Sequence, residues 1–533
     1  MREARLPWYD AGPMKRCLFC GLALVLLFLG GCKHPGADTL GWVRVETEDL
    51  IIRTDVQPDL AVELAQKWQR LRDAIADNEL PCAFERSNVP MEFVLFRDEQ
   101  DLQDLYRRFV AGLTVRSPSS LLDSNTQYVI VRKEATNNTQ LFAHELTHAA
   151  VTICFPGARP WLHEGMASFY ETAQVRDGKL VLGMPAYGFV AMTNVEPTRD
   201  IYPVYVNGTT VWMLPPRLVP DFDELRTMDP VVFAFLGTSR SPSELRQTTA
   251  HYAGSWHAVH LLQFGDRTLH PRFRTYLTGL AEGDDDDQAW DSAFYGVDVA
   301  ARYRDYLNAD YKMMSRPIEL AAPREPSVHP MSREQVALLR ARLYGWSSDA
   351  DMAEARKYLD FAAESAPSSV DVMLHLAAFH SDTGSEEEGR RWLRRALEMA
   401  PNNPEVLATA IRWYAPSEER EARRADLDEW GGLLAQSAQT AFHYAELGEY
   451  LLLIAEDPEA AFEQLNKSLT LDATSGRTYA LAGRALEELG RAGPAMRAYQ
   501  TAIALSEDAP NEFRDMLRLK VKQLRDQRGA PDR

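Results

Sequence analysis

Apolar and polar residues follow two different periods in the first part of the chain. Apolar residues at every second position predict strands, and apolar residues at every third or fourth position predict amphipathic helices. Both patterns occur between residues 40 and 135, so we expect a small mixed α/β unit there. The expected strands are residues 42–45, 50–54, 91–96 and 127–132, and the expected helices are residues 59–75 and 98–110.

A largely apolar helix is expected next, from Thr139 to Val151, and it contains His144-Glu145-Leu146-Thr147-His148, an H-E-x-x-H motif. Residues four apart lie one turn apart on the same face of a helix, so both imidazoles can reach one zinc ion at about 2.0–2.1 Å. Glu145 can then act as general base towards a water on that ion. The alternative is a pair of core histidines, but these polar groups are costly to bury unless something satisfies them.

A second helix is expected over residues 161–171, after a turn-rich break at residues 155–160. Glu164 lies in the first turn of this helix and can point towards a metal ion held by the first helix. Gly165 and Ala167 are small, so we expect the two helices to pack closely. The second helix therefore brings a carboxylate to the region of the two histidines.

The two motifs, H-E-L-T-H and W-L-x-E-G-x-A-x-x-x-E, resemble the gluzincin superfamily of zinc peptidases, in particular the peptidase-MA-like domain, over roughly residues 40–310. The resemblance implies a zincin-like α+β domain that binds one Zn²⁺ ion and hydrolyses peptide bonds. It also implies that Glu164 is the third zinc ligand beside His144 and His148. Glu171 would orient one of the ligand histidines.

Three positions keep alternatives open. His163 stands where relatives often carry Asn or Ser, and it could compete as a metal ligand. Glu171 could be a solvated carboxylate at the helix end. Gluzincins also use a Tyr or His to stabilise the oxyanion, and the helix expected over residues 249–262 offers Tyr252, with His251 as the alternative. A role in the core is the other interpretation of both residues.

The segments around these helices are less regular. Residues 175–248 are rich in Pro, Thr and Asp, and we expect an insertion that borders the cleft. The acidic run Asp284–Asp287 is expected to be a solvated loop, and residues 269–307 to be helical. A sheet before the motif helix would provide an edge strand along which an extended peptide substrate could lie.

The N-terminal segment has the pattern of a secretory signal. Met14 is the expected true start, because a short basic segment and an apolar run follow it. The apolar run of about 12 residues is shorter than the roughly 20 that a spanning helix needs. It ends in Leu29-Gly30-Gly31-Cys32, which resembles the lipobox of bacterial lipoproteins. We therefore expect residues 1–31 to be removed and Cys32 to be lipidated, with an ordinary cleaved signal as the alternative.

Lipidation would make residues 32–40 a tether at a membrane of the bacterial envelope. Lys33 follows the cysteine, where an Asp would favour the inner membrane, so we expect the outer membrane and a periplasmic orientation. Cys82 and Cys154 are the cysteines left after cleavage and lipidation. They could form one disulfide in this oxidising compartment.

Residues 317–330 contain several prolines and are expected to be a linker to a repetitive region. Beyond it, Tyr358-Leu359 recurs as Trp392-Leu393, and an offset of about 34 residues is the tetratricopeptide signature. We expect an all-α solenoid of about four to five repeats over residues 331–533, ending in a capping helix near residues 514–528. Residues 403–439 keep the period poorly. Such a stack offers a concave surface for a peptide or protein partner, and spacing or dimerisation is the alternative role.

The charge of the chain bears on one class of function, nucleic acid binding. A net charge of −19 argues against nucleic acid binding, which needs a basic face. The leading hypothesis is a lipid-anchored zinc metallopeptidase formed by residues 41–316, whose repeats recruit a protein substrate or partner. The competing hypothesis is a non-catalytic scaffold for envelope assembly that binds its partners through the repeats. The sequence leaves the substrate open, and also the choice between endopeptidase and exopeptidase action.

Overall fold

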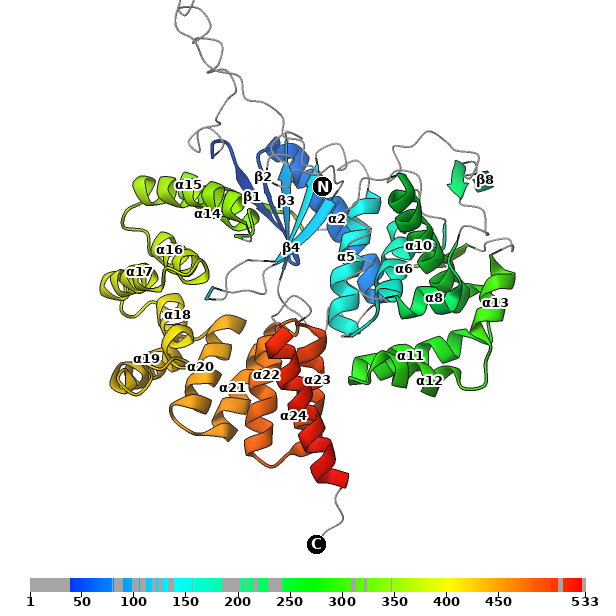
Figure 1. Ribbon diagram of the computed structural model, residues 1–533. Helices are drawn as coiled ribbons and strands as arrows, with labels where there is room; N and C mark the ends of the chain where they lie inside the picture. Colours follow the sequence, from blue (N-terminus) through cyan, green and yellow to red (C-terminus); the bar gives the residue numbers. More distant parts are fainter. Residues whose placement is uncertain are drawn as a thin grey trace, which may run out of the picture.

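The structure is a computed structural model in which a mixed sheet lies between two helical regions (Figure 1). The expected signal segment, Cys32 and Cys82 lie outside the residues that it describes. The described residues are 39–78, 80, 90–97, 105, 112–116, 121–122, 127–132, 139–155, 157–184, 202–206, 209–213, 219–228, 242–307, 313–320, 324–346, 348–506 and 511–529.

Six strands form the central sheet in the order β11-β1-β2-β3-β5-β4. The strands β2, β3 and β5 are parallel, whereas β4 and β11 are antiparallel to their neighbours and form the two edges. The four strands expected from the sequence are present, but β4 and β11 were not anticipated. The strands are β1 (Val43–Glu46), β2 (Leu50–Thr54), β3 (Met91–Phe96), β4 (Gly112–Arg116), β5 (Gln127–Arg132) and β11 (Ser327–Pro330).

Alternate residues of β3 enter two separate cores on the two faces of the sheet. Phe93 packs with Trp68 of α2 (Pro58–Asn78) and with Phe142 of α5 (Thr139–Cys154), with ring centroids 4.9 and 5.2 Å away. Phe96 points to the other face, where it lies edge-on to Trp42 at 5.5 Å. This period of two follows from the pleat of a strand, and it buries both faces of the sheet.

The prediction of a linker over residues 317–330 is wrong at both ends. Met314–Pro317 forms β10, which pairs with β7 (Lys179–Leu182), and Ser327–Pro330 forms β11, which pairs with β1. Prolines indicated a loop, but an edge strand tolerates proline because one side of its backbone needs no ladder partner. The repeats therefore continue directly from the sheet.

The first repeat helix, α14 (Arg333–Leu343), completes the second core of the sheet. It begins with a capping box between Ser332 and Gln335. The guanidinium of Arg340, which is 3% exposed, lies over the rings of Trp42 and Phe96 at 5.5 and 5.4 Å. The boundary between the α/β region and the repeats therefore runs through a shared core.

The solvated loop expected at Asp284–Asp287 is also wrong. Asp285 caps a helix, and Asp286 is 7% exposed. The Asp286 carboxylate accepts hydrogen bonds from Tyr276 and from Arg226 (2.9 Å), and it pairs with Arg159 (3.2 Å). Because Arg159 directly precedes α6 (Pro160–Glu171), this charge cluster anchors the start of the helix that carries Glu164.

The remaining elements of the first region follow α6 in the chain. The insertion expected over residues 175–248 holds two short strand pairs and the start of a long helix. The elements are β6 (Gln174–Arg176), β8 (Tyr202–Val206), β9 (Thr209–Met213), α8 (Phe222–Thr227), α10 (Pro242–His260), the π-helical turn η3 (Leu261–Gly265), α11 (His270–Glu282), α12 (Asp286–Phe294) and α13 (Val299–Tyr306).

The expected helical solenoid is confirmed over residues 333–529. Small residues allow the helices of a pair to cross closely: a Cβ at Gly448 would lie 2.6 Å from Leu465 Cγ, and one at Gly483 would lie 2.7 Å from Tyr499. The helices after α14 are α15 (Asp349–Ser365), α16 (Val370–Asp382), α17 (Glu386–Met399), α18 (Pro404–Tyr414), α19 (Arg424–Ser437), α20 (Ala441–Leu453), α21 (Pro458–Leu471), α22 (Gly476–Glu488), α23 (Ala492–Ala504) and the terminal α24 (Asn511–Gly529).

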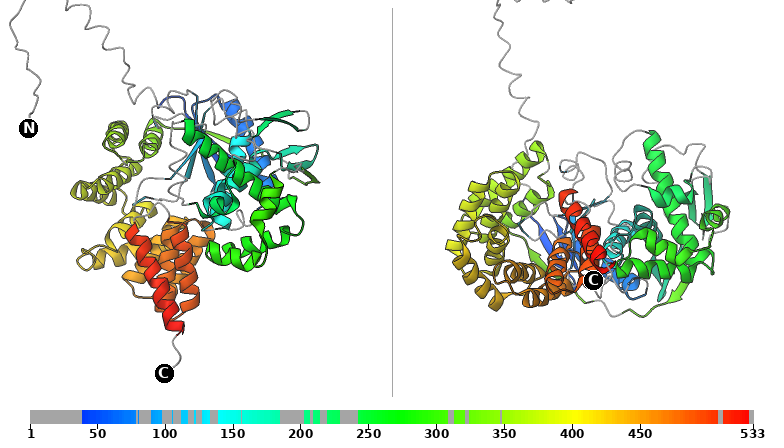
Figure 2. Two further views of the ribbon diagram at one scale, coloured as in Figure 1. Left: turned by 45° about the vertical axis from the view of Figure 1, so that its right-hand side comes forward. Right: turned by 60° about the horizontal axis from the view of Figure 1, so that its bottom comes forward.

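The solenoid starts beside the sheet and curves back to the first region (Figures 1 and 2). At its far end, Ala504 of α23 lies against the turn between α5 and α6, because a Cβ at Gly157 would be 3.5 Å from Ala504 Cβ. Both ends of the arc therefore meet the region that carries the H-E-x-x-H helix. Within the described ranges, no helix is long and apolar enough to cross a membrane.

Candidate metal centre

The candidate site is formed where α5 and α6 pack together. Pro160 starts α6 at a position where its missing N–H is not needed, and the left-handed Gly157 (φ +87°) reverses the chain before it. The sequence predicted that Gly165 brings α6 close to α5, but the structure places Gly165 against α10 instead. A Cβ there would lie 2.5 Å from the backbone oxygen of Ser255 and 2.6 Å from Val259, so Gly165 packs against α10.

The close approach at Gly165 gives a stability prediction. We expect Gly165→Ala to lower the free energy of unfolding, because overpacking costs about 1–3 kcal/mol and exceeds the gain in helix propensity of about 1 kcal/mol. Gly432, in the exposed face of α19, is the matched control because nothing lies within 4 Å of its would-be Cβ. Gly432→Ala is expected to raise the free energy of unfolding by about 0.5–1 kcal/mol. Denaturant titration measures both, and equal shifts would contradict the packing argument.

Three ligand-type atoms converge at the centre of the site. His144 Nε2 and His148 Nε2 are 3.1 Å apart, and Glu164 Oε2 lies 3.6 Å from the first and 3.4 Å from the second. Ligands about 2.0–2.1 Å from a tetrahedral zinc ion lie about 3.3–3.4 Å from each other. Among the described residues, these three form the one group of His, Cys, Asp or Glu side chains close enough to hold a metal ion.

The hydrogen bonds of the three side chains also fit a metal ion. Glu164 Oε2 is buried and has no hydrogen-bond partner, although it faces both imidazoles. A buried carboxylate oxygen without a partner is costly, and a cation between the three atoms would remove that cost. Two imidazoles and one carboxylate are a donor set that zinc takes in catalytic sites.

The carboxylate of Glu171 lies next to Nδ1 of His144. Its Oε2 is 3.3 Å from His144 Nδ1, and its side chain is 9% exposed, so it is not the solvated carboxylate of the alternative interpretation. If His144 Nδ1 donates its hydrogen to Glu171, the lone pair of neutral His144 is on Nε2. That nitrogen faces His148 and Glu164, which is the orientation that a metal ligand requires.

The carboxylates dominate the electrostatics of the site. Burial lowers the pKa of His144, but Glu164 and Glu171 outweigh burial and hold it well above 6.5. Burial raises the pKa of Glu164, but the two imidazoles outweigh burial and hold it well below its usual range. Glu164 and Glu171 thus stabilise positive charge on His144, and the two imidazoles stabilise the negative charge of Glu164.

Tyr252 of α10 reaches the site, whereas His251 does not. The ring of Tyr252 lies 6.4 Å from that of His144, and its hydroxyl is close enough to Glu164 for the charge of that carboxylate to act on it. Burial, and then the charges of Glu164 and Glu145, raise the pKa of Tyr252 well above 10, so its hydroxyl keeps its hydrogen as a donor. His251 Nδ1 instead donates to the backbone oxygen of Gln247 in its own helix, at 2.8 Å.

Two more predicted residues lie near the site but outside the group of three. His163 stacks on His148 with ring centroids 6.2 Å apart, and burial, followed by the charge of His148, lowers its pKa to about 4. Glu145 is 9% exposed and is not one of the three converging side chains. At the end of α5, Cys154 is buried and disulfide-bonded. Its expected partner, Cys82, lies outside the described residues.

The sequence analysis missed the strand that runs along one edge of the site region. The edge strand β4 pairs with β5 and also contacts α5. It is short and begins with a glycine, so its alternation is a weak local signal. The antiparallel pairing of Gly112–Arg116 with Gln127–Arg132 is a contact between segments that no local pattern specifies.

Comparison with known protein families gives matches within the helical region that follows the sheet. The family described as tetratricopeptide repeat matches residues 348–410, and a second match to this description covers residues 476–508. A search of curated proteins found no match.

Solved structures with some likeness to this chain include the following three. The pilF protein of Pseudomonas aeruginosa is 19% identical, with 37% of this chain and 93% of that chain covered and a TM-score of 0.26. PilW, a type IV pilus biogenesis factor, is 15% identical, with 36% and 91% covered and a TM-score of 0.28. MamA from AMB-1 is 21% identical, with 32% and 95% covered and a TM-score of 0.23. By the family matches, the C-terminal region of this chain contains tetratricopeptide repeats, over residues 348–410 and 476–508.

Proposed function

We propose that residues 41–316 form a zinc-dependent metallopeptidase of the gluzincin type, and that the repeats bind its protein substrate or a protein partner. The observation that carries the proposal is the convergence of His144, His148 and Glu164 at spacings of 3.1 to 3.6 Å. A zinc ion held by these residues would lower the pKa of a water molecule and polarise a substrate carbonyl.

The other residues of the site have distinct roles in the proposed reaction. Glu145 accepts the proton of the attacking water and passes it to the leaving amine. The Tyr252 hydroxyl, held next to Glu164 and kept protonated, donates a hydrogen bond to the oxyanion as it develops. Glu171 keeps the Nε2 lone pair of His144 directed at the centre of the site.

A second candidate is a scaffold without catalysis, and the comparisons favour it. Both family matches fall on the repeats, and tetratricopeptide stacks bind peptides and proteins along a concave surface. In this candidate, the three converging side chains would hold a structural metal ion or none. The two candidates agree on protein binding, but only the peptidase requires a metal ion and hydrolyses peptide bonds.

Anchoring by lipid at Cys32 is part of both candidates. It rests on the lipobox-like sequence Leu29-Gly30-Gly31-Cys32, which lies outside the described residues. A lipid anchor at the outer membrane would place the acidic chain in the periplasm, where unfolded and extended polypeptides are available as substrates or partners.

Metal removal separates the two candidates. The chain from residue 33 onward, incubated with denatured casein, is expected to release peptides that mass spectrometry detects. A chelator should abolish the release, and a stoichiometric amount of Zn²⁺ should restore it, because the group of three cannot polarise water without the ion. Cleavage that survives chelation would contradict the proposed mechanism. Absence of cleavage in a zinc-loaded chain, for casein and for a mixed peptide library, would favour the scaffold.

A further inference from the structure

The apolar core of the repeats is thin where α20 meets α22. The buried apolar residues of the earlier repeat helices form one cluster that ends at Ile454, and those of α22, α23 and α24 form another that starts at Ala480. Between these clusters lie five buried residues of α20, α21 and α22, and three of the five are alanines. Repeats of a solenoid contact only their neighbours, so the position of α22–α24 depends on this junction.

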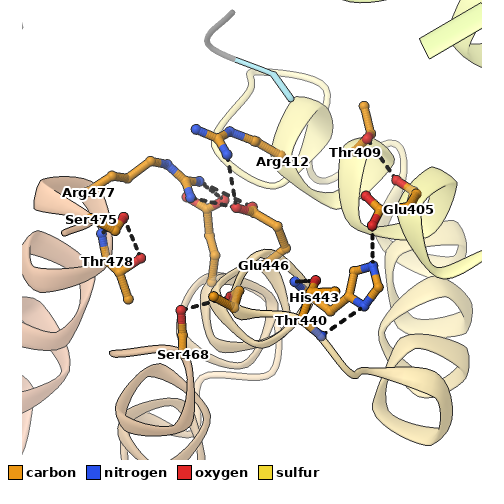
Figure 3. A network of polar contacts seen from close by, with 12 residues as sticks. Glu405, Thr409, Arg412, Thr440, His443, Glu446, Ser468, Ser475, Arg477 and Thr478 are labelled. Atoms are coloured by element: carbon orange, nitrogen blue, oxygen red, sulfur yellow. Dashed lines mark hydrogen bonds and ion pairs between the residues drawn. The ribbon is translucent and has the colours of Figure 1, made fainter. Parts of the chain in front are cut away.

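Four charged side chains meet at the same place (Figure 3). Glu446 and Glu449 of α20 are 0% and 4% exposed. Arg477 of α22 donates hydrogen bonds to both carboxylates, at 2.7 Å to Glu446. Arg412 of α18 lies 3.5 Å from Glu446. We call these four residues the charged junction, because they join α18, α20 and α22.

The two carboxylates of the charged junction share one guanidinium nitrogen. Nη2 of Arg477 donates to Glu446 at 3.3 Å and also to Glu449. Two buried carboxylates this close repel each other when both are ionised, so one of them holds a proton more tightly than usual. Burial, opposed by Arg477 and assisted by the charge of Glu446, raises the pKa of Glu449 from 4.5 to about 7. The charged junction is therefore expected to lose a proton as the pH rises through neutrality.

Other charged side chains on the helices around α20 have different partners. They are Asp428 of α19, which accepts a hydrogen bond from Tyr450 at 3.1 Å, Lys467 of α21, which lies 6.0 Å from the ring of Tyr444, and Glu405 of α18, which lies 3.0 Å from His443 Nε2. Imidazoles titrate near neutral pH, and His443 is the same in every variant compared below. A difference between these variants therefore reports on the charged junction.

On their other side, the last repeats rest on two turns of the first region. A Cβ at Gly157, in the turn between α5 and α6, would lie 3.5 Å from Ala504 Cβ. A Cβ at Gly283, in the turn between α11 and α12, would lie 3.8 Å from Thr501 Oγ1. Thr501 and Ala504 are three residues apart, so they share one face of α23. We call the turns at Gly157 and Gly283 the two glycine turns.

We propose that the charged junction is a proton-operated hinge, which sets how firmly α22–α24 rest on the two glycine turns. With a proton on Glu449, its carboxyl no longer repels Glu446, and the hinge is closed. Loss of that proton to water leaves two negative charges facing each other, so the hinge opens more often and α23 leaves the turns. The turn at Gly157 connects α5 to α6, the helices of the candidate metal centre, and the hinge thus acts on that region. It operates in either candidate function.

Hydrogen exchange of the chain from residue 33 onward tests this inference, at about pH 6 and about pH 8.5 and with correction for intrinsic exchange rates. The pKa of Glu449 is higher in the closed hinge than in an open one, so the closed state loses stability as the pH rises through about 7. Values of about 7 and 4.5 predict about tenfold more opening at the higher pH. Protection factors in α20 and α22 should fall about tenfold, and exchange in the two glycine turns should rise.

Glu449→Gln removes the proton from the argument, because glutamine has the shape of a protonated glutamate and stays neutral at both pH values. This variant should keep, at the higher pH, the protection that the wild type has at the lower pH. Glu459→Gln is the matched control, since Glu459 also joins neighbouring repeats, through Arg491 at 3.1 Å, but is exposed. It should show the same fall in protection as the wild type. Equal pH dependence of Glu449→Gln and the wild type would overturn the inference.

The unsubstituted chain gives a result that does not depend on the folding of a variant. Protection in α20 and α22 that is equal at both pH values would overturn the hinge. Faster exchange in these helices without any change in the two glycine turns would overturn it as well, because the hinge would then not act on the first region. These measurements involve neither zinc nor hydrolysis, so the hinge and the proposed peptidase can fail independently of each other.

Discussion

Replacing Glu145 by glutamine is expected to lower the rate of peptide hydrolysis about 10²–10⁴-fold, the range that a general acid–base contributes. The amide of glutamine cannot accept the proton of the attacking water. The affinity for zinc should stay unchanged, because Glu145 is not one of the three side chains that converge on the proposed ion. Rates of casein or peptide cleavage, measured at equal zinc content, check this prediction.

The matched control is Glu63→Gln, which makes the same change on the exposed face of α2. It should keep the wild-type rate. If Glu145→Gln cleaves as fast as the wild type, the proposed general base is wrong. If it loses zinc as well as activity, Glu145 has a structural role in the site that the arrangement of His144, His148 and Glu164 does not require.

A graded loss of zinc affinity is the second large effect expected. Glu164→Ala removes one of three ligands and leaves the two imidazoles without their shared carboxylate. We expect it to weaken zinc binding by more than about 100-fold. Loss of a residue that only hydrogen-bonds to a ligand costs less, roughly 10–100-fold in affinity. Glu171→Gln should fall in that lower range, because it weakens only the support of His144. Competition with a fluorescent zinc chelator measures both affinities.

The order of the series matters more than any single value. His163→Ala is the control within the site, because His163 stacks on His148 without joining the group of three. It should bind zinc more tightly than either glutamate variant. If His163→Ala instead loses zinc while Glu164→Ala keeps it, His163 and not Glu164 is the third ligand.

The parts of the site that the sequence predicts depend on short spacings within helices. The positions of His144 and His148 follow from helical geometry, since residues four apart share a face of any helix. Glu164 and Glu171 were carried over from a resemblance, and the structure places both beside the histidines. The choice of Tyr252 over His251 needed the packing of α10 against α6, because adjacent residues of a helix point in different directions.

The features that the sequence did not predict depend on contacts between distant segments. Residues 327–330 were expected to be part of a linker, but they pair with β1 at the edge of the sheet. Asp286 was expected to be solvated, but it contacts Arg159, Arg226 and Tyr276. These partners lie 127, 60 and 10 positions earlier in the chain, so no local sequence pattern predicts the contacts. The burial of Leu121 among the repeats is another contact between distant segments. Two leucines in a polar segment do not indicate which residues they pack against.

The zinc content of the unsubstituted chain from residue 33 onward tests the central claim most directly. Elemental analysis should find about one zinc per chain, and X-ray absorption should find imidazole nitrogen and carboxylate oxygen ligands at about 2.0–2.2 Å. That result would place an ion among His144, His148 and Glu164 and justify a search for the substrate. A chain that stays free of zinc after supplementation, although its repeats are folded, would contradict the peptidase and leave a protein-binding scaffold.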